Sequence, residues 1–320
     1  MNPYVGQNGQ IFGVEEHRLC GGKGDGMRLL EIRNGKGLAL TVSADRCADI
    51  SRLTLDGVNF GYFSPCGYVA PTYYDANGAG FLKSFTAGFL TTCGLRNVGS
   101  PCEDAGEALP LHGTIGNTPC ENVAYWVEKN AIFVKATVTD AAPFGAKMVL
   151  TRTLEISLEK NEMTMTDAVE NIGAEAVPFQ MLYHFNVGYP LLTEHTELHI
   201  PATEVAPRND HAATGIADCL KMEKPQNGYE EMCFYHKMAG RAEIKVYNPE
   251  VKKGFVMSYD TEKLPCFTEW KMMGEGEYVL GVEPGNAYPD GRDVMRAKGM
   301  LQMIAPGEIK AHSIKLEFLN

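Results

Sequence analysis

The sequence predicts an all-β fold, a large sandwich of antiparallel sheets, in one domain spanning residues 1–320. Three observations predict it. Short runs rich in β-branched and aromatic residues recur, Gly, Asn and Asp separate them, and few stretches show the 3.6-residue periodicity of an amphipathic helix. Because strands that follow one another without intervening helices pair antiparallel and pack face to face, a large β-sandwich follows.

The first predicted element is a hairpin. Two β-rich runs, residues 28–33 and 38–42, flank the turn sequence Asn34-Gly35-Lys36-Gly37. Further strands are predicted at residues 131–138, 147–156, 162–170, 243–247, 255–259, 278–283 and 309–318. No internal repeat, low-complexity tract or linker interrupts the chain, so we predict no domain boundary.

The segment of residues 62–116 differs from the rest of the chain. It is rich in Gly, Pro and aromatic residues and shows little clean alternation of polar and apolar positions. Long irregular segments inside compact domains are uncommon and are frequently functional. We expect this segment to wrap across one sheet face and to supply part of a pocket.

Charge and composition narrow the class of protein. The net charge of −11 argues against nucleic acid or an anionic membrane as partner, because both reward clustered Lys and Arg. The N-terminus has no signal-peptide pattern and no window is long and apolar enough for a membrane span, so we expect a cytoplasmic protein. The nine cysteines include no CxxC pair, which suits reduced thiols better than disulfides or a zinc site.

Two strand-like runs deliver residues suited to acid–base chemistry. In the first, His184 lies among aromatic residues and shares one strand face with Asn186 and Gly188. In the second, an apolar strand ends in Glu283, just before Pro284, which places a carboxylate at the rim of a cavity. The alternatives are a satisfied core histidine and a solvated strand end. The polar Asn186 beside His184 favours a site.

A third candidate is His112, in the sequence Leu111-His112-Gly113. Glycine lets the backbone approach another surface closely, so this histidine can enter a pocket. The alternative is a loop histidine exposed to solvent.

Together these motifs resemble the aldose 1-epimerase, or galactose mutarotase-like, superfamily. Its members place an LHG histidine before a second histidine in a YHxxFN-like strand and a glutamate near the C-terminus. The finer features, around Asp45-Arg46-Cys47, Thr92-Cys93 and Glu283-Pro284-Gly285, look more like an uncharacterised bacterial branch. The resemblance spans roughly residues 25 to 318.

The resemblance implies a β-supersandwich with a shallow sugar pocket on the concave face of one sheet, and an enzyme that interconverts sugar anomers without a cofactor or metal. It implies that His184 is the general acid at the ring oxygen and Glu283 the general base at the anomeric hydroxyl. His112 would hold a sugar hydroxyl. Opening a hemiacetal needs one proton donor and one proton acceptor, and imidazole and carboxylate suit those roles.

Some positions depart from the better-known mutarotases. Those enzymes carry an arginine ahead of the LHG histidine, for which Arg46 and Arg96 are both candidates here, and an aspartate before a PTG turn, for which Asp210 is the nearest match. Each is alternatively a surface charge. Arg46, Arg96 and Arg208 are also candidates for binding an anionic substituent of the sugar.

Three other groups have two interpretations each. Arg46 and Asp49 either bind sugar hydroxyls or form a structural ion pair. Trp270 either stacks on a sugar face or packs in the core. His195 and His199 are four residues apart, but the glutamate spacing does not match a zinc-protease helix, so we interpret both as surface histidines in or near a strand.

Two other functions remain open from the sequence. A non-catalytic carbohydrate-binding module would keep the aromatic and arginine contacts without needing the acid–base pair. A different epimerase or isomerase would use the same pair on a carbon acid, since fold does not fix reaction.

Overall fold

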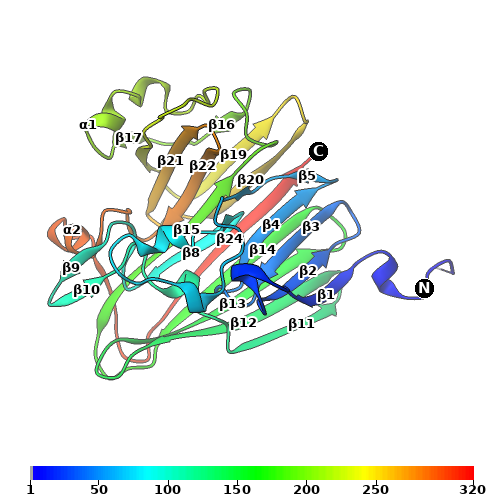
Figure 1. The fold of residues 1–320 in the computed structure, drawn as a ribbon, viewed down its shortest axis with the longest axis horizontal. Helices are drawn as coiled ribbons and strands as arrows, with labels where there is room; N and C mark the ends of the chain where they lie inside the picture. Colours follow the sequence, from blue (N-terminus) through cyan, green and yellow to red (C-terminus); the bar gives the residue numbers. More distant parts are fainter. Residues whose placement is uncertain (1–2) are drawn as a thin grey trace.

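The computed structural model describes residues 3–320 and confirms the all-β prediction. Within those residues, three large antiparallel sheets of five, eight and seven strands form the fold. Figure 1 shows the five- and seven-stranded sheets side by side in front of the eight-stranded sheet. The main apolar core takes buried residues from all three sheets, as a sandwich requires.

The five-stranded sheet begins with the predicted hairpin. Its strands β2 and β3 pair antiparallel across the turn, with Leu29 opposite Ser43 and Arg33 opposite Ala39. The strands lie in the order of the chain: β1 (Gly13–Arg18), β2 (Arg28–Arg33), β3 (Leu38–Ser43), β4 (Asp49–Leu55) and β5 (Val58–Asn59).

The eight-stranded sheet contains most of the other predicted strands, and several alternate between buried and exposed positions because one face meets the core and the other meets solvent. The strand nearest the C-terminus is central in this sheet. The spatial order is β11 (Asn122–Glu128), β12 (Ala131–Ala141), β13 (Lys147–Ser157), β14 (Glu162–Asn171), β24 (Ile309–Leu319), β20 (Lys253–Asp260), β19 (Arg241–Asn248) and β16 (Glu197–His199).

The seven-stranded sheet carries the candidate site. Its central strands are buried on both faces, because the core covers one face and loops cover much of the other. The order is β17 (Glu204–Pro207), β18 (Met232–Lys237), β21 (Cys266–Gly274), β22 (Glu277–Gly285), β15 (Val177–Val187) and β23 (Gln302–Ile304), and β8 (Leu90–Leu95) also pairs with β15.

Residues 62–116 cross the outer face of the seven-stranded sheet, as expected, but they are more regular than their composition predicts. Strand β8 lies inside this segment, and all six of its residues are buried, so no alternation marks it in the sequence. Two short pairs also lie there: β6 (Tyr62–Phe63) with β7 (Ala87–Gly88), and β9 (Cys102–Asp104) with β10 (Glu107–Leu109).

Helical structure is sparse. Two short α-helices, α1 (Asp210–Ala213) and α2 (Arg292–Ala297), lie in loops of the seven-stranded sheet, and single 3-10 turns occupy Asn8–Gln10, Gly22–Gly24, Pro71–Tyr73, Gly80–Lys83, Ile115–Asn117 and Ile216–Asp218. Within residues 3–320, no helix has the length and apolar character needed to cross a bilayer. All nine cysteines fall in this range and are free thiols.

Candidate active site

His184 and Glu283 face each other across two neighbouring strands. The register of β15 and β22 pairs Leu182 with Gly285 and Phe185 with Val282, which places His184 opposite Glu283. Residues opposite each other in an antiparallel pair project from the same face of the sheet, close enough for their side chains to meet. The His184 Nε2 and Glu283 Oε1 atoms lie 3.2 Å apart.

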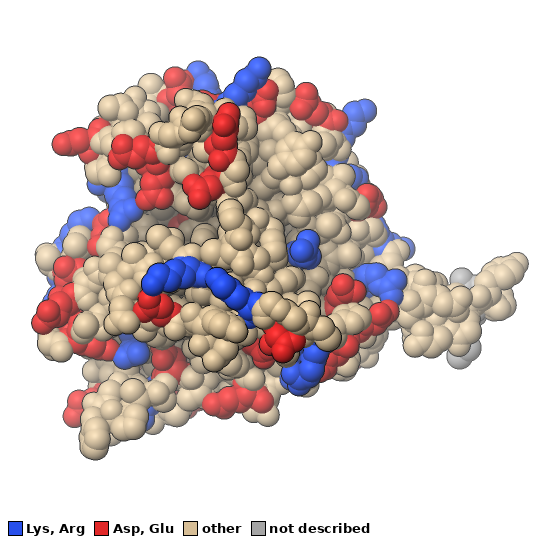
Figure 2. Space-filling model, in the orientation of Figure 1, with Lys and Arg blue, Asp and Glu red and all other residues tan. Residues whose placement is uncertain are grey.

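These two residues lie in a pocket of about 460 Å³, within the size range of ligand sites. One wall comes from the face of β18, β21 and β22, and the other from the segment of residues 62–116 together with Pro289. Figure 2 shows the molecule hollowed between the region of β21 and the region of β8. The side chains of Phe81, Phe85 and Met272 give much of the lining an apolar character.

Glu283 lies deeper than the sequence indicates, which corrects the prediction of a carboxylate at a strand end. Strand β22 continues through Pro284 to Gly285, and Glu283 is only 1% exposed. Pro284 is tolerated inside the strand because the ladder of backbone hydrogen bonds between β15 and β22 is interrupted at this position. The ladder therefore does not need the amide hydrogen that proline lacks. A β-carbon added to Gly281 would lie 2.2 Å from Glu283 Oε1, so the carboxylate folds back over the space that this glycine leaves.

Several polar atoms at the base of the pocket lack protein partners. Thr268 of β21 is paired in register with Glu283, so Thr268, Glu283 and His184 form a row across three strands. Among the described residues, Thr268 Oγ1, Glu283 Oε1 and His184 Nδ1 are buried without a hydrogen-bond partner, although Oε1 lies near His184. Because buried polar groups are normally satisfied, their convergence indicates a place for a polar ligand.

Burial favours the uncharged forms of the pair. It lowers the pKa of His184 to about 4, and the contact of the ring with the Asn186 side chain raises this pKa by a smaller amount. It raises the pKa of Glu283 well above the usual value, Glu231 raises it further, and Arg208 opposes the rise. Both shifts favour a neutral imidazole and a protonated carboxyl group over an ion pair of the two side chains.

His112 enters the pocket from the loop after β10. Its backbone is left-handed, with φ 57°, and the following Gly113 is packed so closely that an added β-carbon would lie 2.2 Å from the carbonyl oxygen of Gly94. The close approach predicted for this glycine is confirmed. The His112 ring lies 5.5 Å from that of His184, and its Nδ1 accepts a hydrogen bond of 3.3 Å from the Gly99 amide.

This hydrogen bond and burial define the state of His112. Burial, followed by the nearby His184 and Arg208, lowers its pKa well below the usual value, so the ring is neutral. Because Nδ1 accepts the Gly99 amide proton, the ring proton is assigned to Nε2. His112 is therefore a neutral hydrogen-bond donor in the pocket.

Of the other predicted site residues, Trp270 lines the pocket. It is half-buried, its indole ring lies 5.2 Å from the His184 ring, and its Nε1 donates to Glu231 Oε2 at 2.7 Å. Arg208, which the sequence indicated only as a candidate for anion binding, also lines the pocket. Its Nη2 donates to Ser100 Oγ at 2.9 Å and to the Pro289 carbonyl at 3.2 Å.

The remaining candidates are not part of the pocket lining. Arg46 is buried and donates to two backbone carbonyl groups, and Asp49 is paired with Arg152 at 2.8 Å, so the two do not form an ion pair with each other. Arg96 pairs with Glu107 at 2.6 Å. Asn186 is fully buried next to the pocket and donates to the His184 carbonyl, and Asp210 is exposed on α1.

The pocket lining also contains residues that were not predicted as site residues, among them Thr268, Glu231 and Ser100. Thr268 had a usable signal, because it lies two residues before Trp270 and therefore on the same strand face. Glu231 and Ser100 lie in loops, where no periodicity reports orientation.

No metal-binding cluster forms at the pocket. Within residues 3–320, the one group of side chains with metal-compatible spacing is Glu15, His17 and Glu31, which is exposed on β1 and β2. His195 and His199 are both exposed, as predicted, and His199 is in strand β16.

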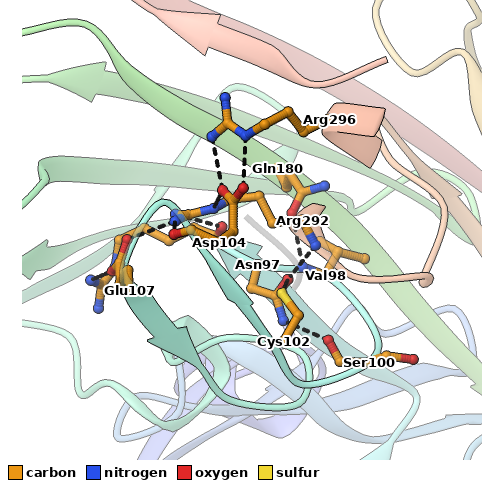
Figure 3. A network of polar contacts seen from close by, with 10 residues as sticks. Asn97, Val98, Ser100, Cys102, Asp104, Glu107, Gln180, Arg292 and Arg296 are labelled. Carbon is orange, nitrogen blue, oxygen red and sulfur yellow. Dashed lines mark hydrogen bonds and ion pairs between the residues drawn. The ribbon is translucent and has the colours of Figure 1, made fainter. Parts of the chain in front are cut away.

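A polar network behind the pocket supports its loops. Figure 3 shows Arg292 and Arg296 of α2 converging on Asp104 of the β9–β10 hairpin. Nearby, the Asn97 side-chain amide donates to the carbonyl groups of Ser100 and Pro110, at 3.0 and 2.8 Å. Asn97 thus ties together the two loop segments that carry Ser100 and His112.

Solved structures share this fold. A provisionally assigned aldose 1-epimerase from Klebsiella pneumoniae subsp. pneumoniae has 26% identity and a TM-score of 0.92, over 98% of this chain and 86% of that one. A galactose mutarotase-like protein from Clostridium acetobutylicum has 13% identity and a TM-score of 0.70, over 97% and 99%. A galactose 1-epimerase from Lactobacillus acidophilus has 14% identity and a TM-score of 0.61, over 96% and 98%.

The last two structures, at low identity, show the galactose mutarotase-like fold alone. No curated protein sequence matches the chain. A family model described as a domain of unknown function, DUF4432, matches residues 24–318, which is nearly the whole chain. The protein therefore belongs to the DUF4432 family and has a galactose mutarotase-like β-sandwich fold.

Proposed function

We propose that this protein is a carbohydrate isomerase that interconverts the anomers of a sugar, an aldose 1-epimerase. The observation that carries the proposal is the row of buried polar groups, His184, Glu283 and Thr268, at the base of a pocket with otherwise largely apolar walls. His184 and Glu283 contact each other in this row, while His184 Nδ1 and Thr268 Oγ1 have no hydrogen-bond partner. Sugars combine apolar C–H faces with closely spaced hydroxyl groups, which suits such a pocket. The similarity to the Klebsiella protein supports the same reaction class.

The reaction needs balanced proton transfers. In ring opening, a base removes the proton from the anomeric hydroxyl O1, the bond between C1 and the ring oxygen breaks, and an acid protonates the ring oxygen. Rotation about the C1–C2 bond then exposes the other face of the new carbonyl group to the same oxygen. Ring closure reverses both transfers and yields the other anomer.

His184 and Glu283 together supply this chemistry. The two side chains share one proton, and at a separation of 3.2 Å that proton passes from Glu283 to His184 when a polar sugar enters. In the resulting ion pair, His184 donates to the ring oxygen and Glu283 accepts the proton of O1. Ring opening returns His184 and Glu283 from the ion pair to the uncharged forms that burial favours. This gain offsets part of the energy needed to open the ring.

The neighbouring side chains orient the sugar. His112 offers its Nε2 proton to a sugar oxygen, Thr268 offers a free hydroxyl, and Trp270 offers an aromatic surface beside His184. These contacts hold the anomeric carbon next to the acid–base pair. Such positioning of the substrate contributes to the rate of the reaction.

Glu283→Gln tests the proposal. It keeps the shape and polarity of the side chain but removes proton transfer, so the rate of anomer exchange should fall by about 10²–10⁴-fold. Exchange is measured by NMR on a panel of aldoses, with circular dichroism as the check of fold. The matched control is Glu275→Gln, in the exposed turn between β21 and β22, which should keep the wild-type rate.

Three outcomes would contradict parts of this proposal. Full activity of Glu283→Gln on the substrate would show that the assigned base is wrong. Tight sugar binding without anomer exchange by the wild-type protein would identify a binding module, whereas incorporation of solvent deuterium at a carbon atom would identify a different epimerase.

A further inference from the structure

The pocket face of the seven-stranded sheet is ordered in rows that lead away from the acid–base pair. Thr268 and Glu283 form the first row, and Trp270 and Gly281 form the second. The third row pairs Met272 with Val279. Glu231 directly precedes β18, where Met232 is paired with Lys271, and this places Glu231 beside the third row.

The Glu283 carboxylate lies over the second row rather than the first, because it folds back over Gly281. Successive rows on one face of a strand are roughly 7 Å apart. This is about the width of a pyranose ring, so a sugar with its anomeric carbon at Glu283 extends to the third row. The far end of the sugar then meets the carboxylate of Glu231. A hydrogen bond of 2.7 Å from Trp270 Nε1 holds this carboxylate in place.

The charges that line the pocket are mostly negative. Its lining contains the carboxyl groups of Glu231, Glu277 and Glu283, against the single cation Arg208. Arg208 already donates to Ser100 and Pro289, and its Nε lies 3.6 Å from the carboxylate of Asp290, which also pairs with Lys298. Figure 2 shows acidic side chains gathered above the hollow, in the region of β21.

The other two candidate arginines do not change this balance. Arg46 is committed to the carbonyl groups of Val69 and Ser84, and Arg96 is paired with Glu107. Neither lines the pocket. An anionic group on the sugar would therefore meet carboxylates without an uncompensated cation, while a hydroxyl or ammonium group would donate to them.

We propose that Glu231 is a specificity-determining residue that selects sugars with a hydrogen-bond donor, hydroxyl or ammonium, at the end remote from the anomeric carbon, and rejects sugars with a phosphate or carboxylate there. The proposal rests on the proposed function for the orientation of the sugar. It assigns the uncharged and amino sugars as substrates of this pocket and excludes sugar phosphates and uronic acids.

The test compares four probes that differ only at C6, the end remote from the anomeric carbon: galactose, 6-amino-6-deoxygalactose, galacturonate and galactose 6-phosphate. Affinities are measured by calorimetry or saturation-transfer NMR, and anomer exchange is measured on the same samples. Wild-type protein should bind galactose and 6-amino-6-deoxygalactose more tightly than either anionic probe by about tenfold or more at low salt. This preference should shrink as the salt concentration rises.

Glu231→Gln should raise the affinity for galacturonate relative to galactose by about tenfold, since it removes one charge and keeps the acceptor for Trp270. Glu275→Gln is the matched control, because it removes a charge from the exposed β21–β22 turn outside the pocket lining, and it should leave the ratio unchanged. A merely structural role for Glu231 would change affinity for all four probes equally.

Preferred binding of an anionic probe by the wild-type protein, absence of binding of both uncharged and amino probes, or an unchanged ratio in Glu231→Gln would overturn this proposal. Its failure is distinguishable from that of the proposed function. Charge discrimination without anomer exchange would contradict only the isomerase activity, and anomer exchange with a preference for anionic sugars would contradict only the role of Glu231.

Discussion

The buried carboxyl group of Glu283 costs stability at neutral pH. Burial raises its pKa well above 4.5, so the folded protein keeps a proton that the unfolded chain releases. A group with a raised pKa contributes its full stability below the unfolded pKa, and that contribution is lost as the pH rises towards the folded pKa. The side chain that we propose as the base is thus unfavourable for folding at neutral pH.

Glu283→Gln should therefore stabilise the protein in a pH-dependent way. The free energy of unfolding should exceed that of the wild type by ~1–3 kcal/mol at pH 8, and the difference should approach zero near pH 4. Urea unfolding at several pH values measures it. A difference that does not change with pH would show that Glu283 titrates normally in the folded protein.

Gly281 leaves the space into which the carboxylate of Glu283, the proposed base, folds. An alanine methyl group there would lie 2.2 Å from Glu283 Oε1 and 2.9 Å from Trp270 Cβ, while the backbone is outside the left-handed region and accepts alanine. Gly281→Ala should displace the carboxylate from His184 and lower kcat by about 100-fold with the fold intact. Gly145→Ala, where the nearest contact is an Ala142 methyl group at 3.4 Å, is the control. Wild-type kcat in Gly281→Ala would show that the observed carboxylate position is not the reactive one.

At the scale of single residues, the sequence indicated which side chains could act as acid and base, but it did not indicate which side chains are in contact. His184 and Glu283 could be proposed from their residue types and strand positions, but their contact depends on the register between β15 and β22, which no local pattern reveals. Arg46 and Asp49 are close in sequence, yet each is bound to partners far along the chain. Such partners cannot be inferred from three-residue spacing.

At the scale of elements, helix α2 and the β9–β10 hairpin form one polar unit behind the pocket. Arg292 and Arg296 both bind Asp104, at 2.6 and 2.7 Å, but their side chains are 3% and 46% exposed. The two arginines lower the pKa of Asp104 to about 2 through their hydrogen bonds, which outweigh its burial. The same carboxylate therefore has a buried partner and an exposed one.

The two arginines should differ in what they contribute. Arg292→Met removes the buried partner and should cost ~3–5 kcal/mol of unfolding free energy. It should also raise KM, because the loops carrying Ser100 and His112 pack on this unit. Arg296→Met, its matched control, should cost less than ~1 kcal/mol. Equal costs in thermal unfolding would contradict this division.

The predicted strands with clear alternation, such as residues 147–156, were found within observed strands because one face of their sheet meets solvent. Strand β8 was not predicted as a strand, because burial on both faces removes alternation. The predicted end of β22 at Glu283 was wrong, since proline fits where the ladder is interrupted. Strand pattern therefore predicts half-buried sheets better than the central strands that carry the site.

At the scale of the whole molecule, one guanidinium group joins the three large sheets. Arg152 in β13 binds Asp167 in β14 at 2.7 Å, Asp49 in β4 at 2.8 Å and Thr92 in β8 at 2.8 Å. The side chain is only 1% exposed. Both carboxylates are buried together with Arg152. Removal of the arginine therefore leaves two buried carboxylates without this partner of opposite charge, which destabilises the fold.

Arg152→Met should lower the unfolding free energy by ~3–5 kcal/mol, measured by urea denaturation. Arg152→Lys keeps the charge but loses the forked geometry of the guanidinium group, so it should lower the unfolding free energy by less than Arg152→Met. This variant can be measured if Arg152→Met does not fold. Arg33→Met, which removes an exposed pair with Glu15, should cost less than ~1 kcal/mol. A loss in Arg152→Met as small as in Arg33→Met would contradict the role of Arg152 in joining the sheets.

The central place of β24 has a consequence for how the protein is made. This strand lies between β14 and β20, so the eight-stranded sheet stays in two parts until residue 319 has left the ribosome. Until then both neighbours expose unpaired edges, which are sites for aggregation. The pocket strands β21 and β22 precede β24 in the chain, but the sheet behind them closes only when β24 pairs with β14 and β20. The nascent chain therefore exposes these two sheet edges until β24 has formed.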